Sequence, residues 1–258
     1  LNRLSESATL AMARMSRELK AQGHNVIALS LGEPDFNTPD FIKETGINAI
    51  NENKTGYTPV CGVPELKQAI IHKLKRDNNL DYSEDQIIVS CGVKQCLFNL
   101  TQATLGPGDE AIVLAPYWVS YPSMVSLAGA TPVVIQAGIE QHYKITPEQL
   151  EAAITQKTKM VFFNSPSNPS GACYTLEELK KLAEVLKKHP NILIVSDDIY
   201  EYILWGQPQF HNIVNAEPAL YDRTIVMNGV AKAHCMTGWR IGFAACHSTL
   251  MNAMKKIQ

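Results

Sequence analysis

Short apolar runs alternate with helical patterns along most of this chain, and this alternation limits its fold more than any other feature. Runs typical of buried strands lie at 86–90, 111–115, 132–136, 159–164, 191–196, 223–227 and 241–246. Strands that are apolar throughout and separated by helices favour a mostly parallel sheet covered on both faces. We therefore expect an α/β fold, an α-β-α sandwich, with its ligand at the carboxyl ends of the strands.

Helical spacing of apolar residues and capping signals place several helices between these strands. We expect helices over 4–22, 39–51 and 93–105 and a further one from Pro64. Thr38 should cap the second of these helices, with Pro39 at its first position. Capping boxes begin two more, at Thr146 and Thr175. Residues 251–258 have the pattern of a helix that starts and does not end, so we expect a C-terminal part to be missing.

Composition narrows the class of protein. The chain has 258 residues, 45% hydrophobic and 19% charged, as in ordinary soluble globular proteins. A net charge of −2 gives no reason to expect nucleic acid or an anionic membrane as a partner. No apolar run approaches the roughly 20 residues of a membrane span. The N-terminal residues lack the pattern of a signal peptide, so a cytoplasmic location is expected.

The cysteines and histidines show no metal-binding spacing. None of the six cysteines forms a Cys-x-x-Cys pair, and several lie in apolar segments. We expect reduced, mostly buried thiols without a disulfide framework or a metal site. His234 is the one histidine near the chemistry proposed below, and a solvated or core role fits it better than metal ligation.

The stretch from Asn228 to Arg240 carries the strongest chemical signal. It places Lys232 among small and weakly polar residues, with Arg240 eight positions further on. A poorly solvated ammonium near positive charge loses basicity and becomes a nucleophile able to form a Schiff base. Arginine suits a phosphate. The pair therefore suggests covalently bound pyridoxal phosphate (PLP); the alternative is a surface lysine beside a salt-bridged arginine.

Further polar motifs follow predicted strands. Residues 90–95 join a strand to a helix through Gly92, where free N–H groups attract anions. Trp118 could stack on a flat heteroaromatic ring. Taken alone, the first motif also fits an ordinary turn, and Trp118 also fits a core side chain.

Two more motifs lie after later strands. The segment 164–171 is rich in asparagine and proline and would fix a side-chain amide, although by itself it predicts only a turn. Asp197 ends a buried strand, where a carboxylate is costly without a cationic partner such as a protonated pyridine nitrogen. Tyr200 could reach the same ligand. Alternatively, Asp197 and Asp198 are helix-capping acids.

In this order and spacing, the motifs resemble those of the fold-type I PLP-dependent enzymes, specifically the class I aminotransferases of the bacterial aspartate aminotransferase branch. The resemblance extends over nearly the whole chain. Besides the lysine stretch, it rests on Leu31–Phe36, Gly56–Pro59, Pro107–Glu110, Pro116–Tyr121, Asn168–Gly171 and Asp197–Tyr200.

The resemblance implies roles around the cofactor ring and at the substrate. Lys232 would be the catalytic Schiff-base lysine, and Asp197 would keep the pyridinium nitrogen protonated. Asn168 and Tyr200 would hydrogen-bond the ring hydroxylate, with Tyr200 also counted as catalytic. Trp118 would stack on the ring. Trp118 and Asn168 would also contact substrate.

The resemblance also implies a phosphate site, a substrate contact and a shared dimer site. Arg240 would bind the phosphate together with backbone groups of Gly92, Val93 and Lys94. Tyr57 would reach the phosphate of the neighbouring subunit in a homodimer. Gly32 would bring backbone to the substrate carboxylate.

The implied organisation is an N-terminal arm and small-domain segment over 1–45 and a PLP-binding large domain over 46–258. The implied reaction is ping-pong transamination between aspartate, or a similar amino acid, and a 2-oxo acid such as 2-oxoglutarate. A PLP-dependent β-lyase, and the PLP-binding module of a transcription regulator, are the alternatives.

The chain departs from the family pattern at a few positions. Ser170 and Asp198 stand where threonine and glutamate are usual, and Gly229 and Ala231 replace serines near the phosphate. No residue matches the arginine that binds the substrate α-carboxylate in the family's C-terminal small domain.

Overall fold

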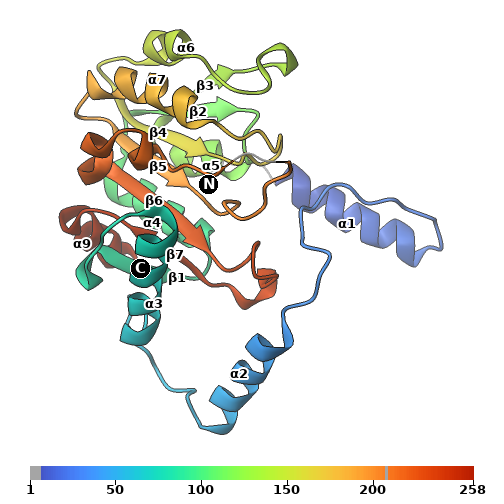
Figure 1. Ribbon diagram of the computed structural model, residues 1–258. Coiled ribbons are helices and arrows are strands. Elements are labelled where there is room, and N and C mark those ends of the chain that lie inside the picture. Colours follow the sequence, from blue (N-terminus) through green and yellow to red (C-terminus); the bar gives the residue numbers. More distant parts are fainter. Residues whose placement is uncertain (1–6, 207–208) are drawn as a thin grey trace.

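A seven-stranded sheet forms the centre of the protein (Figure 1). The computed structural model describes residues 7–206 and 209–258. The strand order is β1-β7-β6-β5-β4-β2-β3, and β7 alone runs antiparallel to its neighbours in this sheet. The strands are β1 (Ile87–Ser90), β2 (Glu110–Ala115), β3 (Thr131–Gln136), β4 (Thr158–Asn164), β5 (Leu193–Asp197), β6 (Thr224–Gly229) and β7 (Gly242–Ala245). The predicted α/β fold with a mostly parallel sheet is confirmed.

Helices cover both faces of the sheet. The helices of the described residues are α1 (Ala8–Ala21), α2 (Asp40–Asn51), α3 (Pro64–Asn78), α4 (Val93–Thr104), α5 (Ser120–Leu127), α6 (Pro147–Ala153), α7 (Leu176–Lys187), α8 (Ile213–Ala216) and α9 (Ser248–Ile257), and those from α3 onward cover the sheet. Successive strand residues point to opposite faces, so Val161 and Phe163 join one apolar core while Met160 and Phe162 join the other. The first core contains residues of α3, α6, α7 and α8, and the second contains residues of α4, α5 and α9.

The capping predictions hold at two helices and fail at a third. Thr146 and Thr175 each accept a backbone hydrogen bond within a complete capping box. The prediction that Thr38 caps α2 is wrong, because the helix begins at Asp40 and no side chain caps it. The Thr38 hydroxyl instead donates to the carbonyl of Cys235, 2.5 Å away. This hydroxyl, which the local sequence pattern predicted as the helix cap, therefore makes a tertiary contact.

The cysteines are all free, as expected, but only Cys96 and Cys246 are buried. The prediction of mostly buried thiols is therefore wrong, since Cys91 lies exposed in a turn. The described residues contain no cluster of side chains that could hold a metal ion. Among them, no helix combines the length and apolar character that crossing a bilayer requires.

The first two helices extend away from the sheet (Figure 1). Helix α1 begins at Ala8, and the part of the predicted helix over 4–6 lies outside the described residues. The division of the chain at residue 45 stays a prediction, and α2 runs across that position. Between these helices, residues 31–38 return to the sheet and contact the loop after β6, which brings them to the candidate site.

Candidate active site

A cavity of about 210 Å³ opens at the carboxyl ends of the strands. Most of its walls come from segments that directly follow β1, β2, β4, β5 and β6. Parallel strands deliver these segments to one edge of the sheet. The lining includes nearly all of the residues predicted to bind a cofactor: Gly92, Val93, Lys94, Trp118, Asn168, Asp197, Tyr200, Lys232 and Arg240.

Lys232 lies half-buried in the loop after β6. Its ammonium donates a hydrogen bond to the Gly32 carbonyl at 2.6 Å and lies 5.8 Å from the centre of the Tyr200 ring. Burial lowers the pKa of Lys232; Glu33 opposes this effect, and the positive charge of Arg240 adds to it. The predicted loss of basicity is confirmed, and it increases the fraction of the nucleophilic free amine.

Asp197 ends β5 as a buried carboxylate, 4% exposed. One carboxylate oxygen accepts a hydrogen bond from the Tyr121 hydroxyl at 2.6 Å. The backbone carbonyl of Asp197 accepts another from the Asn164 side chain at 2.9 Å. Burial raises the pKa of Asp197 to about 6, against the opposing effect of the Tyr121 bond. A cationic partner in the cavity would remove this cost of ionisation.

Tyr200 and Asn168 face the cavity from neighbouring strands. The Asn168 amide donates to the Tyr200 hydroxyl at 3.3 Å, and the Asn168 backbone N–H donates to the Asn164 side chain at 2.7 Å. Burial raises the pKa of Tyr200, and the charge of Asp197 adds to the rise. Tyr200 therefore presents a protonated phenol, which is able to donate a hydrogen bond to an anionic oxygen.

The start of α4 and Arg240 together form a cradle for an anion. Gly92 precedes the helix with φ of 82°, and a side chain there would approach within 2.5 Å of the Arg240 guanidinium. Arg240 is held by a 2.8 Å bond from its guanidinium to the Thr237 carbonyl. Free backbone N–H groups at the helix start and a fixed guanidinium suit a phosphate.

Trp118 lines the cavity and is held by neighbouring groups. Its ring meets Tyr121 edge-on at 5.5 Å, and the Lys94 ammonium lies 5.5 Å from its centre. Tyr121 in turn stacks on Phe162 at 5.1 Å. An indole held in this way offers a flat surface to an aromatic ligand.

Two predicted site residues do not line the cavity. Gly32 is not among the lining residues, and its carbonyl accepts the hydrogen bond from Lys232. Tyr57 is fully exposed in the segment between α2 and α3. The role predicted for Tyr57, at the phosphate of a second subunit, stays a prediction.

The sequence reasoning missed two polar residues that organise the site, Tyr121 and Asn164. Tyr121 is 3% exposed and donates directly to Asp197. Asn164 bonds both the backbone of Asp197 and that of Asn168. Tyr121 lies in the Pro116–Tyr121 motif, but no role was predicted for it, because a tyrosine in an apolar segment is typical of the hydrophobic core. Only the packing of α5 against the sheet brings its hydroxyl to β5.

The cavity therefore combines a lysine of lowered pKa, a buried carboxylate bonded by the Tyr121 hydroxyl, a phenol donor and an anion cradle. This arrangement can hold a phosphorylated, flat, nitrogen-containing ring that has an aldehyde within reach of an amine. PLP has all of these features. The fit rests on the donor set and on the space that a side chain at Gly92 would fill.

Comparison with known proteins agrees with this chemistry. The family model described as aminotransferase class I and II matches residues 24–258. A probable aspartate/prephenate aminotransferase of Rhizobium leguminosarum bv. phaseoli and an aspartate/prephenate aminotransferase of Cereibacter sphaeroides are both 55% identical over 258 residues. In each case the match covers 100% of this chain and 64% of the relative, so the chain spans about two thirds of its curated relatives' length.

Solved structures give the same result. The aspartate aminotransferase of Rhizobium meliloti superposes with a TM-score of 0.94 at 43% identity, covering 98% of this chain and 64% of that one. The Thermus thermophilus aspartate aminotransferase with maleate gives 0.94 at 42% identity, covering 99% of this chain and 66% of that one. These matches confirm the resemblance inferred from the motifs: the chain belongs to the class I and II aminotransferase family.

Proposed function

We propose that this chain carries the PLP-binding site of an aminotransferase that moves an amino group from aspartate, or a similar amino acid, to a 2-oxo acid. The convergence of Lys232, Asp197 and Arg240 on one cavity carries the proposal. Relatives 55% identical are named aspartate/prephenate aminotransferases. Because prephenate is itself a 2-oxo acid, we include it beside 2-oxoglutarate as a candidate acceptor.

Each residue has a defined task in this proposal. Lys232 would hold the cofactor through its amine, and the free amine could move the proton at the substrate α-carbon. Asp197 holds the proton on the ring nitrogen. When bound, PLP supplies an electron sink that stabilises negative charge at that carbon. Tyr200 and Asn168 hydrogen-bond the ring oxygen.

The remaining tasks concern binding and orientation. Arg240 and the backbone of Gly92, Val93 and Lys94 bind the phosphate, and Trp118 orients the ring. Gly32 offers backbone near the substrate carboxylate, where its carbonyl already meets Lys232.

We further propose a homodimer that acts in amino acid biosynthesis in the cytoplasm. Six free cysteines fit a reducing compartment. The segment around α2 exposes large apolar side chains that association would cover. These are Ile27, Leu29, Phe36, Phe41 and Ile50. A fully exposed Tyr57 is free to reach a second subunit.

Borohydride reduction of the full-length protein with PLP, followed by peptide mapping, tests the site. The pyridoxyl label is expected on Lys232 and is expected to disappear in K232A. The exposed Lys180 provides a control, because K180A should leave the label in place. A label on any other lysine refutes the assignment.

The reaction is tested separately from the site. Oxo-acid-dependent transfer from aspartate should be observed with 2-oxoglutarate or prephenate, without release of ammonia and pyruvate. With an amino acid that carries a sulfur leaving group on its β-carbon, release of ammonia, pyruvate and the thiol without an oxo acid would instead identify a β-lyase.

A further inference from the structure

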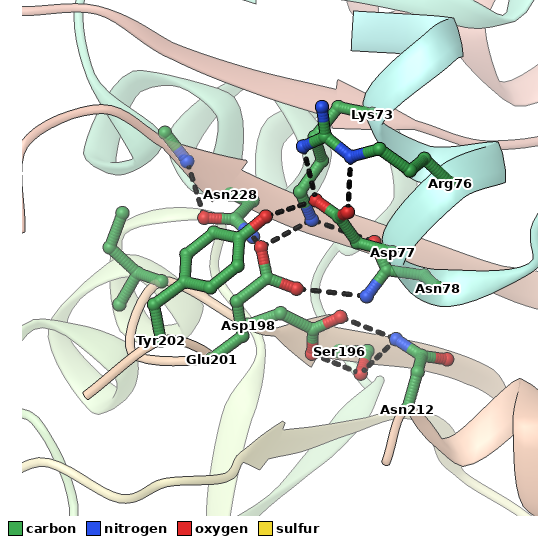
Figure 2. A network of polar contacts seen from close by, with 12 residues as sticks. Lys73, Arg76, Asp77, Asn78, Ser196, Asp198, Glu201, Tyr202, Asn212 and Asn228 are labelled. Carbon is green, nitrogen blue, oxygen red and sulfur yellow. Dashed lines mark hydrogen bonds and ion pairs between the residues drawn. The ribbon is translucent and has the colours of Figure 1, made fainter. Parts of the chain in front are cut away.

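A mostly buried polar network joins α3 to the ends of β5 and β6 (Figure 2). We name it the Glu201 network. Its members are Lys73, Asn78, Ser196, Asp198, Glu201, Asn212 and Asn228. None of them lines the cavity or takes part in the chemistry proposed above.

Glu201 is the centre of this network and is 4% exposed. One carboxylate oxygen accepts a hydrogen bond from Asn228 of β6 at 2.8 Å and forms an ion pair with Lys73 of α3. The other oxygen accepts from Asn78, also of α3, at 2.8 Å. A single side chain thus connects the loop after β5 to two other elements.

Glu201 belongs to the segment that carries two of the proposed cofactor contacts. Within 197–201, Asp197 and Tyr200 face the cavity, while Asp198 and Glu201 face the network. The Glu201 backbone N–H donates to the Asp198 carbonyl at 2.9 Å, which makes this segment a tight turn. A shift of the Glu201 side chain would therefore move Tyr200, its direct neighbour.

The second connection leads to Lys232. Asn228 lies in β6, four residues before Lys232, and its amide donates to Glu201. The Asp198 backbone N–H also donates to the Met227 carbonyl at 2.8 Å, which ties the same turn to β6. The network therefore holds the turn with Tyr200 and the strand leading to Lys232 in one fixed relation.

The charges of the network also favour a positioning role. Burial, reinforced by the charge of Glu201, raises the pKa of Asp198 well above its usual range, and Lys73 forms its ion pair with Glu201. A buried ion pair contributes little net stability compared with apolar residues of the same size. Its directional bonds do, however, fix geometry.

We propose that Glu201 is a positioning residue, which through Lys73, Asn78 and Asn228 sets the placement of Tyr200 and Lys232 around PLP. The inference rests on the proposed function. It concerns the orientation of the cofactor rather than contact with it, since Glu201 does not reach the cavity.

The test compares PLP binding and the near-visible circular dichroism of bound PLP in the full-length wild type, E201Q and K73M. E201Q keeps the size of the side chain and turns one acceptor into a donor facing Asn78 or Asn228. Both variants should weaken PLP binding about tenfold, the lower range for losing an outer-shell partner. Both should also change the dichroism at saturating PLP, a signal of ring orientation that loss of stability alone does not move.

Two further variants keep the test decisive. K73M/E201Q leaves no unpaired buried charge, so it serves if a single variant does not fold, and it should show the same weakened binding and altered dichroism. K75M, on the same helix as Lys73, removes the exposed ion pair between Lys75 and Asp81 and should match wild type.

Several outcomes overturn the inference. PLP affinity within twofold of wild type and unchanged dichroism in E201Q and K73M would do so. Opposite effects of E201Q and K73M on PLP affinity would also overturn it, because they would show that the charge of the network, and not its geometry, controls PLP binding. If wild type itself bound no PLP, the proposed function would fail instead.

Discussion

The buried carboxylate of Asp197 should make the cofactor-free protein less stable than a variant with a neutral side chain at this position. Its pKa is raised from 3.8 to about 6 by burial. Ionisation therefore costs the folded chain more than the unfolded chain. The contribution of Asp197 to stability is fullest below pH 3.8 and is lost as the pH rises through about 6.

The size of this effect follows from the pKa difference. Each pKa unit corresponds to about 1.4 kcal/mol, so the cost reaches about 3 kcal/mol at pH 8 and about 1.6 kcal/mol at pH 5. D197N stays neutral at both pH values and can still accept the hydrogen bond from Tyr121. It should stabilise the cofactor-free protein by those amounts while weakening its binding of PLP.

Urea unfolding of cofactor-free wild type and D197N at pH 5 and pH 8 measures the difference. D222N replaces an exposed aspartate and should change the unfolding free energy by less than about 0.5 kcal/mol at either pH. A D197N protein no more stable than wild type at pH 8, or a gain that does not grow between the two pH values, would refute the reasoning.

Three further predictions concern the same cavity. Y121F removes the hydroxyl that donates to Asp197. Because a hydrogen bond to a charged group is lost, PLP binding, measured by titrating the cofactor-free protein, should weaken roughly tenfold. R240A should weaken PLP binding by at least about tenfold but leave binding of pyridoxal, which lacks the phosphate, unchanged; an equal loss for both ligands would contradict the phosphate role. G92A places a side chain against the Arg240 guanidinium at a backbone φ of 82°, so it should lower PLP affinity. G23A, at a positive φ where a side chain meets open space and outside the cavity lining, should leave PLP affinity unchanged.

The layered fold and most of the walls of the cavity can be predicted from the amino-acid pattern alone. Apolar strands separated by helices require a covered parallel sheet, because both faces of each strand must be buried. Such a sheet delivers the segment after each parallel strand to one edge. The pattern of strands therefore predicts that Asp197, Asn168 and Lys232 lie close together.

Tertiary structure alone decided which groups support those residues. Tyr121 reaches Asp197 only because α5 packs on the sheet. Thr38 bonds to Cys235, and does not cap α2, because residues 31–38 fold back onto the loop after β6. The contacts of Glu201 also join segments more than a hundred residues apart in sequence, as with Asn78. Local patterns report the period of a strand or helix. They carry no information on which distant donor meets a buried acceptor, because that depends on how the elements pack.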